Sequence, residues 1–312
     1  MREKKNFAER TKALKSDETR KKYFLVYEGK DTERLYFEAV NELRGQIKID
    51  PLIELVPVIR SYSEEGWSNP QKIVQRMADN VDEIKSGNIS YETLLNWIME
   101  YFEDQGYIKN NRPLAKNMWS TLLWICFDKM KVSLKQPVFD LKESCENIFK
   151  ILELEKGLEN RIHDVATILQ YGISIYEEGW DKICFIVDRD RDSFTDNQYE
   201  YVTKQCKDRG YGLYVTNPCF EFWLLMHFDD IAEIDEKQLL ENIKVTSKYR
   251  YAEHELRKRV PGYKKSKYDA KMLVGNIEQA IYNEKIFCED VEKLKEKIGS
   301  NIGLLIREMQ QN

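Results

Sequence analysis

The sequence feature that most constrains the fold is the stretch Lys182–Asp192, KICFIVDRDRD. Its apolar run, Ile183–Val187, is too short for a core helix and is rich in β-branched and aromatic residues, which is typical of a buried strand in a parallel sheet. Acidic residues follow at once, at Asp188, Asp190 and Asp192. Because open α/β folds bind ligands at the carboxyl ends of their strands, the stretch predicts a carboxylate cluster at the sheet edge.

Three carboxylates this close together need a counter-charge, which a divalent cation can supply. The alternative is a solvated acidic turn that is neutralised by its neighbours Arg189 and Arg191. Both interpretations stay open on this stretch alone, because motifs this short also match by chance.

A second apolar run of strand length, Tyr23–Tyr27, also ends in acid, at Glu28. The residues that follow, EGKDTE, predict a turn and then a helix from Glu33 to Leu43, capped by Asp31 or Thr32. Glu28 is therefore expected at the carboxyl end of one parallel strand, just as the aspartates lie at the end of another.

Two further acids lie close to predicted strand ends. Glu33 falls in the first helical turn and can point back to the strand end, although any first-turn acid also gains from the helix dipole. Glu221 follows a predicted strand, Gly212–Thr216, and Pro218, which suits a helix start; it either supports the site or only caps its helix. The acids of three strand ends are thus predicted to converge, and Mg²⁺ or Mn²⁺ fits such a set of oxygen ligands.

The rest of the chain predicts helices, with one more strand at Ile53–Val58. About a hundred residues of helical pattern between two strands are too long for a crossover, so an inserted helical subdomain is expected. Its expected features are an apolar face within Leu94–Phe102, another within Leu122–Met130, helices near Glu143–Leu154 and Arg161–Tyr171, and core positions for Trp97, Trp119 and Trp124.

Beyond the acidic strand, a helix is expected over Gln198–Arg209, and His227 in an apolar helical run is interpreted as a hydrogen-bonded structural histidine. Tail helices are expected near Ala270–Ile281 and Glu289–Met309. The predicted fold is α/β, a small parallel sheet flanked by helices. Its expected parts are a basic leader at 1–22, the sheet domain at 23–61 and 180–270, the helical insertion at 62–179 and C-terminal helices at 271–312.

The formal net charge of −5 is unevenly distributed. Residues 1–22 carry nine Lys and Arg against four Asp and Glu, and residues 244–272 carry ten against three. Because screening confines each charge to roughly 10 Å, such segments can bind a polyanion although the chain is acidic overall. In the second segment, tyrosines at 249, 251, 263 and 268 alternate with the basic residues, which suits phosphate contact and base stacking. The alternative is that both segments are ordinary solvated surface.

The composition favours a globular protein in the cytoplasm. Hydrophobic residues make up 42% of the chain, enough for a core. No apolar run approaches the length of a membrane span, and the amino terminus lacks the apolar centre of a signal peptide. The six cysteines are scattered and the histidines are three, so neither a disulfide framework nor a zinc site is predicted.

The order of these motifs, strand-EG-x-x-TE and then strand-DxD, resembles a Toprim domain, the metal-binding fold of topoisomerases, bacterial primases and OLD-type nucleases. The motifs YEGKDTERLYFEAV, FIVDRDRDSF and TNPCFEFWLLMHF, followed by YKKSKY, resemble RloB-like proteins, which are implicated in bacterial anti-phage defence and abortive infection. The resemblance covers about residues 20–61 and 180–270 and does not account for the helical insertion.

The resemblance implies roles for single residues. Glu28 matches the motif glutamate, a metal ligand or general base, while Asp188 and Asp190 match the DxD metal ligands. Glu33 matches the acid that OLD-type nucleases direct toward a second metal, although it stands five residues after Glu28 rather than four. Further expected site residues are Asp192 as an outer ligand, Glu221 as a supporting acid and either Lys264 or Lys265 as the lysine that steadies transition-state charge.

The function expected from these residues is a Mg²⁺- or Mn²⁺-dependent nuclease in phage defence, acting on DNA or RNA. The expected partners are nucleic acid bound through 1–22 and 244–272, a second copy of this chain, and a separate ATPase chain, since no P-loop motif is present; no membrane is expected. One alternative is a module on the same fold that binds nucleic acid or a phage component without cleaving it. Another is a phosphohydrolase of the haloacid dehalogenase type, but Asp192 stands where that group has Thr or Val.

Overall fold

The computed structural model describes residues 20–29, 31–58, 69–104, 106–108, 112–156 and 178–311. The chain divides into two compact units, Met1–Val58 with Glu178–Asn312, and Ile59–Glu177. The first unit contains the sheet, and the second is helical, with limits close to those expected for the insertion. Almost all of the basic leader lies outside the described residues.

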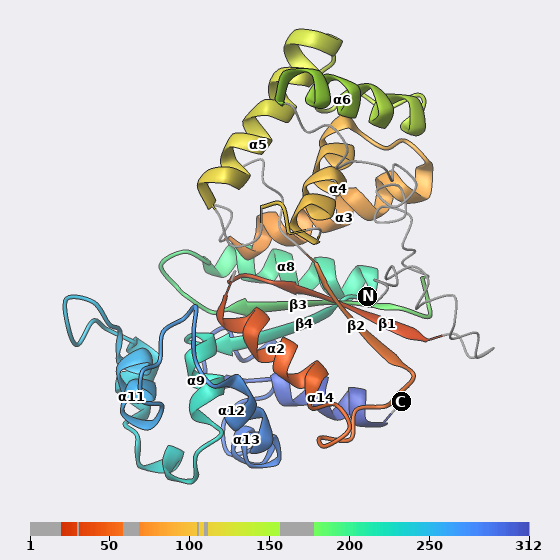
Figure 1. Ribbon diagram of the computed structural model, residues 1–312. Coiled ribbons are helices and arrows are strands. Elements are labelled where there is room, and N and C mark those ends of the chain that lie inside the picture. Colours follow the sequence, from red (N-terminus) through yellow and green to blue (C-terminus); the bar gives the residue numbers. More distant parts are fainter. Residues whose placement is uncertain are drawn as a thin grey trace, which may run out of the picture. The chain divides into compact units, whose positions relative to one another are not determined.

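The sheet has five strands in the order β2-β1-β3-β4-β5 (Figure 1). Four are parallel to one another, and the short β5 pairs antiparallel with β4. The predicted α/β class and the predicted strands are confirmed, whereas the two residues of β5 have no recognisable pattern in the sequence. The bounds are β1 Lys21–Tyr27, β2 Ile53–Val58, β3 Lys182–Asp188, β4 Gly212–Asn217 and β5 Gly299–Ser300.

Helices lie on both faces of the sheet. Helix α8 (Asp196–Arg209) lies on one face, and α2 (Thr32–Glu42), α9 (Phe220–Leu225) and α14 (Ile302–Gln311) lie on the other (Figure 1). The remaining helices of this unit are α10 Glu236–Glu241, α11 Tyr251–Arg259, α12 Ala270–Gly275, α13 Ile277–Glu284 and the 3₁₀ turn Asp229–Glu233.

Strand alternation assigns the side chains to the two layers. Cys184 and Ile186 of β3 pack in one core cluster with residues of α2 and α9. Because side chains alternate along a strand, Asp188 falls on the same side as these two residues. Arg189 falls on the opposite side, over the Phe194 and Tyr199 rings, and is 1% exposed.

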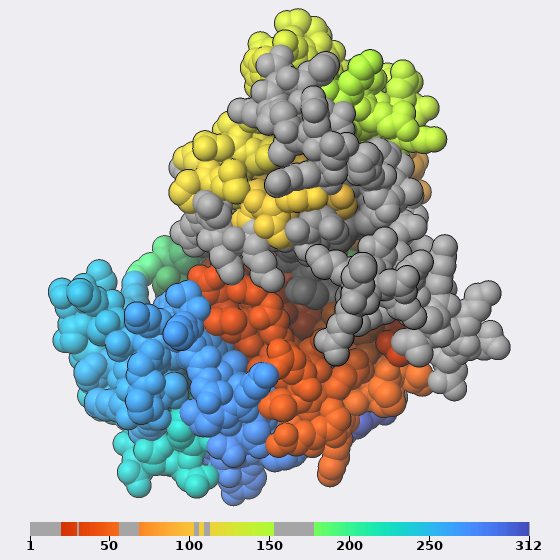
Figure 2. All heavy atoms as spheres, in the orientation of Figure 1, coloured from red at the N-terminus to blue at the C-terminus, as the bar shows by residue number. Residues whose placement is uncertain are grey.

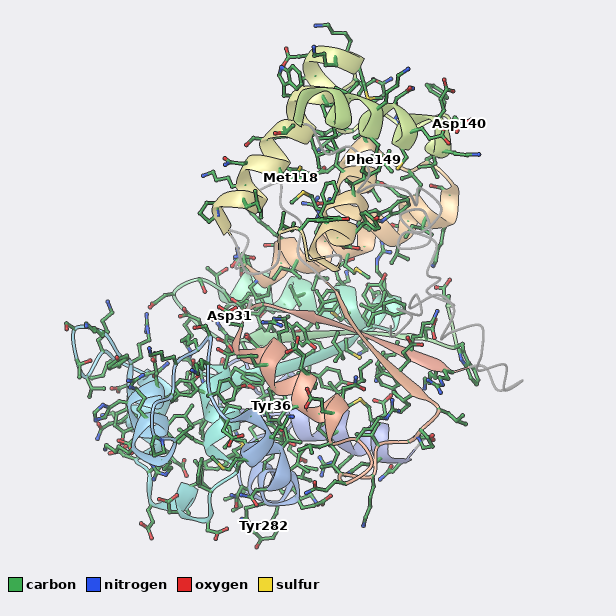
Figure 3. The ribbon with its side chains drawn as sticks, in the orientation of Figure 1. Asp31, Tyr36, Met118, Asp140, Phe149 and Tyr282 are labelled. Carbon is green, nitrogen blue, oxygen red and sulfur yellow. The ribbon has the colours of Figure 1, made fainter. Side chains whose placement is uncertain are left out.

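A buried polar pair joins α2 to the end of α9, beneath the sheet. The Tyr36 hydroxyl lies 2.9 Å from Nε2 of His227, and the carbonyls of Trp223 and Leu224 lie 3.1 and 3.2 Å from Nδ1 (Figure 3 labels Tyr36). Burial lowers the pKa of His227 to about 4, so the ring is neutral, donates from Nδ1 and accepts from the tyrosine. The structural role predicted for His227 is confirmed.

The carboxyl-terminal part differs from the expected pair of helices. Residues 289–298 form turns, and the last helix, α14, begins only at Ile302. Pro218 does not open a helix either, because it follows a cis peptide bond and Cys219 is the N-cap of α9. The segment from 271 onward belongs to the same compact unit as the sheet.

The helical unit contains α3 (Pro70–Ser86), α4 (Tyr91–Asp104), α5 (Arg112–Trp124) with a π-helical turn (Ile125–Met130), and α6 (Leu141–Lys156). The predicted apolar faces of α4 and α5 form its core, which also buries Trp97 and Trp119, with Trp124 packed beside them. The helix expected over Arg161–Tyr171 lies outside the described residues. Among the residues described, no helix is long and apolar enough to cross a membrane.

Candidate metal centre at the carboxyl edge of the sheet

The acids at the ends of β1 and β3 meet through backbone hydrogen bonds. The Glu28 backbone N–H donates to the Ile186 carbonyl at 3.0 Å, which continues the pairing of the two strands. Oε2 of Glu28 accepts from the Asp188 backbone N–H at 2.8 Å, and Oδ1 of Asp188 accepts from the Phe220 N–H at 2.8 Å. Residues 160 positions apart thus share one rim, as the sequence predicts.

Glu33 is held at the same rim by the turn that precedes its helix. It is 4% exposed, and its Oε1 accepts from the Gly29 N–H at 2.9 Å. A Cβ on residue 29 would lie 2.0 Å from the other carboxylate oxygen of Glu33, so any larger residue at this position would displace that carboxylate. The glycine of the EG-x-x-TE motif is therefore explained by local packing, because it leaves space for the carboxylate of the last glutamate.

The third strand end brings an acid and a lysine together. Glu221, in the first turn of α9, is 2% exposed, and its Oε1 lies 2.7 Å from Nζ of Lys265. The fully buried Tyr263 donates from its hydroxyl to the same oxygen at 3.3 Å. Of the two candidate lysines, the structure brings Lys265 into the site, whereas Lys264 is exposed and pairs through its backbone with Lys267.

The segment that carries Lys265 is also attached to α2. The Thr32 hydroxyl donates to the Lys265 carbonyl at 3.3 Å, and the Tyr268 hydroxyl donates to the Thr32 carbonyl at 2.7 Å. Thr32 therefore joins two segments and is not the helix cap; the N-cap is Asp31, without a side-chain cap hydrogen bond. Figure 2 shows α2, in red, next to the blue segment near residue 265 on the molecular surface.

The charges of the site are unequal. Burial raises the pKa of Asp188 well above its ordinary value, and three neighbouring carboxylates raise it further, those of Glu28, Glu33 and Glu221. Burial also raises the pKa of Glu33. Burial alone would raise the pKa of Glu221, but the charge and hydrogen bond of Lys265 outweigh it and lower that pKa. Among the described residues, Lys265 is the basic group that acts on Asp188, Glu33 and Glu221 together, and a bound cation would stabilise the ionised form of these acids.

The remaining acids of the DRDRD turn have contacts of their own. Oδ1 of Asp190 accepts from the backbone N–H of Asp192 at 3.1 Å and closes the turn. Asp192 is 78% exposed and lies 3.3 Å from Arg250. The metal-ligand roles expected for both residues stay predictions.

The two arginines of the turn do not neutralise Asp188. Arg189 is buried, pairs with Asp196 and donates to the Phe194 carbonyl on the α8 side. Arg191 donates to the Glu296 carbonyl at 2.8 Å. The interpretation of the stretch as an acidic turn neutralised by its own arginines is therefore wrong.

The four rim acids offer carboxylate oxygens, the ligand type that Mg²⁺ and Mn²⁺ prefer in proteins. The nearby Cys219 does not change this, because burial and the charge of Glu221 raise its pKa and keep it a thiol. Within the described part of the chain, no three acidic, histidine or cysteine side chains are placed to hold an ion as they stand. Those of Glu28, Glu33 and Asp188 accept backbone hydrogen bonds instead.

Several contacts of the site could not be deduced from the motifs. Thr32 lies in EG-x-x-TE, and Tyr263 and Tyr268 begin and end YKKSKY, but these motifs do not say what the side chains contact. Glu253 of α11, whose pKa is raised by burial and by Glu221, lies in none of the motifs. Their contacts could not be deduced from the sequence, because these residues come from α2, α11 and the segment after α11, which are far apart along the chain.

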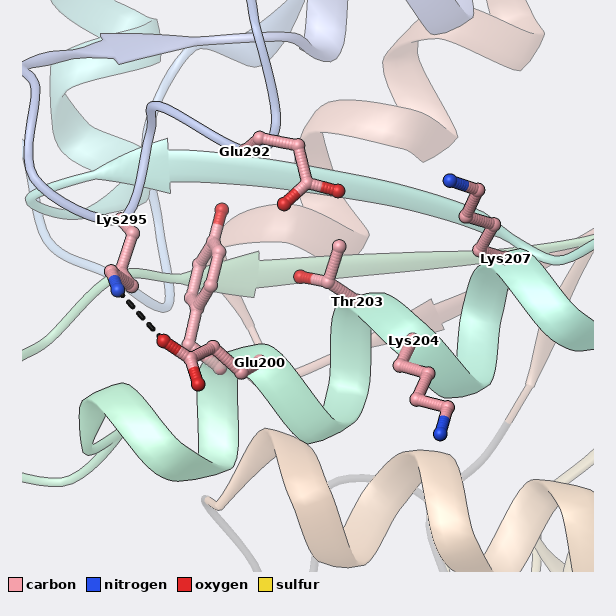
Figure 4. A pocket seen from close by; sticks show the side chains of 7 residues that line it. Glu200, Thr203, Lys204, Lys207, Glu292 and Lys295 are labelled. Carbon is pink, nitrogen blue, oxygen red and sulfur yellow. Dashed lines mark hydrogen bonds and ion pairs between the residues drawn. The ribbon is translucent and has the colours of Figure 1, made fainter.

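A pocket lies elsewhere, on α8. Its lining is of mixed charge, and Glu200 pairs there with Lys295 at 2.9 Å (Figure 4). It has a volume of about 280 Å³, and its lining residues are Tyr199, Glu200, Thr203, Lys204, Lys207, Glu292 and Lys295. None of the rim acids lines it, so the carboxylate edge and not this pocket is the candidate site.

The fold and the site together define a class, an α/β protein with an acidic centre where parallel strands end. The family model described as RloB-like protein matches residues 23–309, and the chain therefore belongs to the RloB-like family. Neither the search of curated proteins nor the search of solved structures found a match.

Proposed function

We propose that this protein is a Mg²⁺- or Mn²⁺-dependent nuclease of the Toprim type that acts in bacterial defence against phage. The observation that carries the proposal is the convergence of Glu28, Asp188 and Glu221 from three strand ends, with Glu33 beside them and Lys265 as the facing cation. The role in defence rests on the family resemblance alone.

Each residue has a part in this chemistry. Glu28 and Asp188, with Asp190, are the residues that would hold the ion, and Glu33 and Glu221 add negative charge around it. A bound divalent ion would polarise the phosphodiester and lower the pKa of the attacking water. Lys265 is fixed against Glu221 at 2.7 Å, from where its ammonium can steady charge on the phosphate.

The nuclease chemistry is tested with Glu28→Gln and Asp188→Asn. Cleavage of DNA and of structured RNA is measured with Mn²⁺, and Mn²⁺ affinity is measured by calorimetry. Both variants should lose at least about 100-fold in cleavage rate, as loss of a metal ligand or general base does, and Asp188→Asn should also bind Mn²⁺ more weakly. Glu200→Gln is the matched control, because it removes an exposed carboxylate of α8 and should cleave like wild type.

Unchanged cleavage by Glu28→Gln and Asp188→Asn would show that the assigned chemistry is wrong. A wild-type protein that binds nucleic acid in the presence of a chelator but never cleaves it with Mn²⁺ would instead support the binding module. The two outcomes differ in the wild type, so a variant that fails to fold cannot confuse them.

A further inference from the structure

Two short hairpins flank helix α11. Before the helix, Lys244 and Arg250 form a bridge, and the Val245 N–H donates to the Tyr249 carbonyl at 3.1 Å. After the helix, Lys264 and Lys267 exchange two backbone hydrogen bonds, of 3.0 and 2.8 Å. We call these two elements, residues 244–250 and 264–267, the first and the second hairpin.

Arg257 of α11 connects the two hairpins. Its guanidinium lies over the Tyr249 ring of the first hairpin, 4.2 Å from the ring centroid. It also donates to the carbonyl of Tyr263, the residue that precedes the second hairpin. One side chain therefore contacts both elements and fixes their separation.

Both hairpins are attached to the acidic rim. The first is joined to the DRDRD turn by the ion pair of Arg250 with Asp192. The second is joined to Glu221 through Lys265 and through the Tyr263 hydroxyl. Any long ligand held by the hairpins would therefore pass close to the candidate metal centre.

The basic residues of 244–272 divide into two groups. Six are engaged, by carboxylates or, for Arg257, by a carbonyl and a ring: Arg250, Arg257, Lys258, Arg259, Lys265 and Lys271. Four are exposed and have no acidic partner among the described residues: Lys244, Lys248, Lys264 and Lys267. All four lie on the two hairpins.

Strand alternation explains the direction of the second hairpin. Tyr263 and Tyr268, which flank it, face inward, where their rings pack 5.3 Å apart. Lys264 and Lys267, the neighbours of these tyrosines, therefore face outward and lie opposite one another across the hairpin. Two lysines are thus displayed outward on the second hairpin, and neither has an acidic partner among the described residues.

The tyrosines of the segment differ in their access to bases. Tyr263 is fully buried, and the Tyr268 ring packs against it. The Tyr249 ring is covered on one face by Arg257. Base stacking by Tyr263 is excluded by its burial, whereas the four lysines are exposed.

From these observations we propose that Lys244, Lys248, Lys264 and Lys267 bind successive phosphates of a nucleic-acid backbone and read no base sequence. This inference rests on the proposed function, because it describes how the nucleic-acid substrate of the candidate metal centre is bound. Lysine ammonium groups contact phosphates as point charges, and such contacts are independent of sequence. Lys265 has a separate role, because its charge is directed to Glu221.

The test is the salt dependence of binding. Affinity for short labelled DNA and RNA strands is measured by fluorescence anisotropy in a chelator, from about 50 to 200 mM NaCl. Log affinity falls linearly with log salt, and each lost phosphate contact makes this negative slope shallower by about 0.7 to 0.9. Changing all four lysines to glutamine should therefore make the slope shallower by about 3. Wild-type affinity should be the same for scrambled sequences of equal length.

The matched control changes four exposed lysines on other elements, Lys48, Lys207, Lys237 and Lys285, to glutamine. This variant has the same net charge as the hairpin variant and should keep the wild-type slope. An equal slope for the two variants, or base-sequence preference in the wild type, would overturn the inference. Circular dichroism of both variants verifies folding.

The inference and the proposed function can fail separately. Binding that depends on the hairpin lysines, without any cleavage in Mn²⁺, would leave the inference standing and the nuclease wrong. Cleavage that depends on Asp188, together with an unchanged salt slope in the hairpin variant, would support the nuclease and contradict the inference about the hairpin lysines.

Discussion

Two buried glutamates of the sheet-containing unit are held by the same local device. Glu33 accepts from the Gly29 N–H at 2.9 Å, and Glu284 accepts from the Gly303 N–H at 2.8 Å. A Cβ at either glycine would lie about 2 Å from the carboxylate, at 2.0 and 2.1 Å. Burial raises the pKa of both acids.

Their surroundings differ. Glu33 lies at the open ends of parallel strands, facing Glu221 and Lys265. Glu284 lies at the end of α13 against α14, where Arg307 is 3.8 Å away, Glu289 is nearby and Oε2 has no hydrogen-bond donor. A raised pKa alone therefore does not identify a functional acid. We propose that convergence of several acids on one edge does, and that distinction can be measured.

The largest expected effect is on the pH dependence of stability, from Glu284→Gln. The pKa of Glu284 is raised from 4.5 to about 8, so between these values the folded state binds more protons than the unfolded state. Stability therefore falls as pH rises from 4.5 to 8, by up to about 1.4 kcal/mol per pH unit. The variant should lack this slope. Its stability relative to wild type should therefore rise by about 2–4 kcal/mol between pH 5 and pH 8.

Urea unfolding of both proteins at a series of pH values gives this difference. The variant should cleave like wild type, because none of the rim acids is among the groups that shift the pKa of Glu284. Parallel stability curves for the two proteins would show that the pKa of Glu284 is the same in the folded and unfolded states, and the contrast with Glu33 would lose its basis.

The next effect is expected from Lys265→Met. Glu221 is 3% exposed at its side chain and would lose its counter-charge, which costs about 2 kcal/mol when allowance is made for the 58% exposure of the lysine. Adding Glu221→Gln should recover most of that loss, but neither variant should cleave. Arg307→Met is the corresponding change beside Glu284. It removes the 2.6 Å ion pair with Glu289 as well as the 3.8 Å contact with Glu284, and should cost about 1 kcal/mol.

Urea unfolding at neutral pH compares these three proteins with wild type. A Lys265→Met protein as stable as wild type would mean that Glu221 is neutral without its lysine.

The smallest effect separates the two glycines. Gly29→Ala and Gly303→Ala each push a buried carboxylate aside and should each cost about 1–2 kcal/mol. Only Gly29→Ala should also reduce cleavage, because only Glu33 belongs to the rim. Thermal unfolding and the nuclease assay are run on both variants below their melting temperatures, and equal loss of cleavage would contradict the comparison.

Much of the site follows from residues near one another in the chain. The apolar runs 23–27 and 183–187 have the length and side chains of buried strands, and an acid follows each of them. Parallel strands end at one edge, so the meeting of Glu28 with Asp188 could be deduced before the structure was seen. The turns at 289–298 and the strand at 299–300 could not, because the strand is two residues long and pairs with β4, which lies some 80 positions earlier.

The sequence by itself determined the strands, the acids at their ends and the basic segments, because the period of hydrophobic side chains is a local property. Only the tertiary structure decided which charge faces which. It buried Arg189 on the α8 side, brought Lys265 to Glu221 and turned Lys264 and Lys267 outward. The physical reason is that neighbouring residues of a strand or hairpin point to opposite sides, so the partner of each charge depends on packing across distant segments.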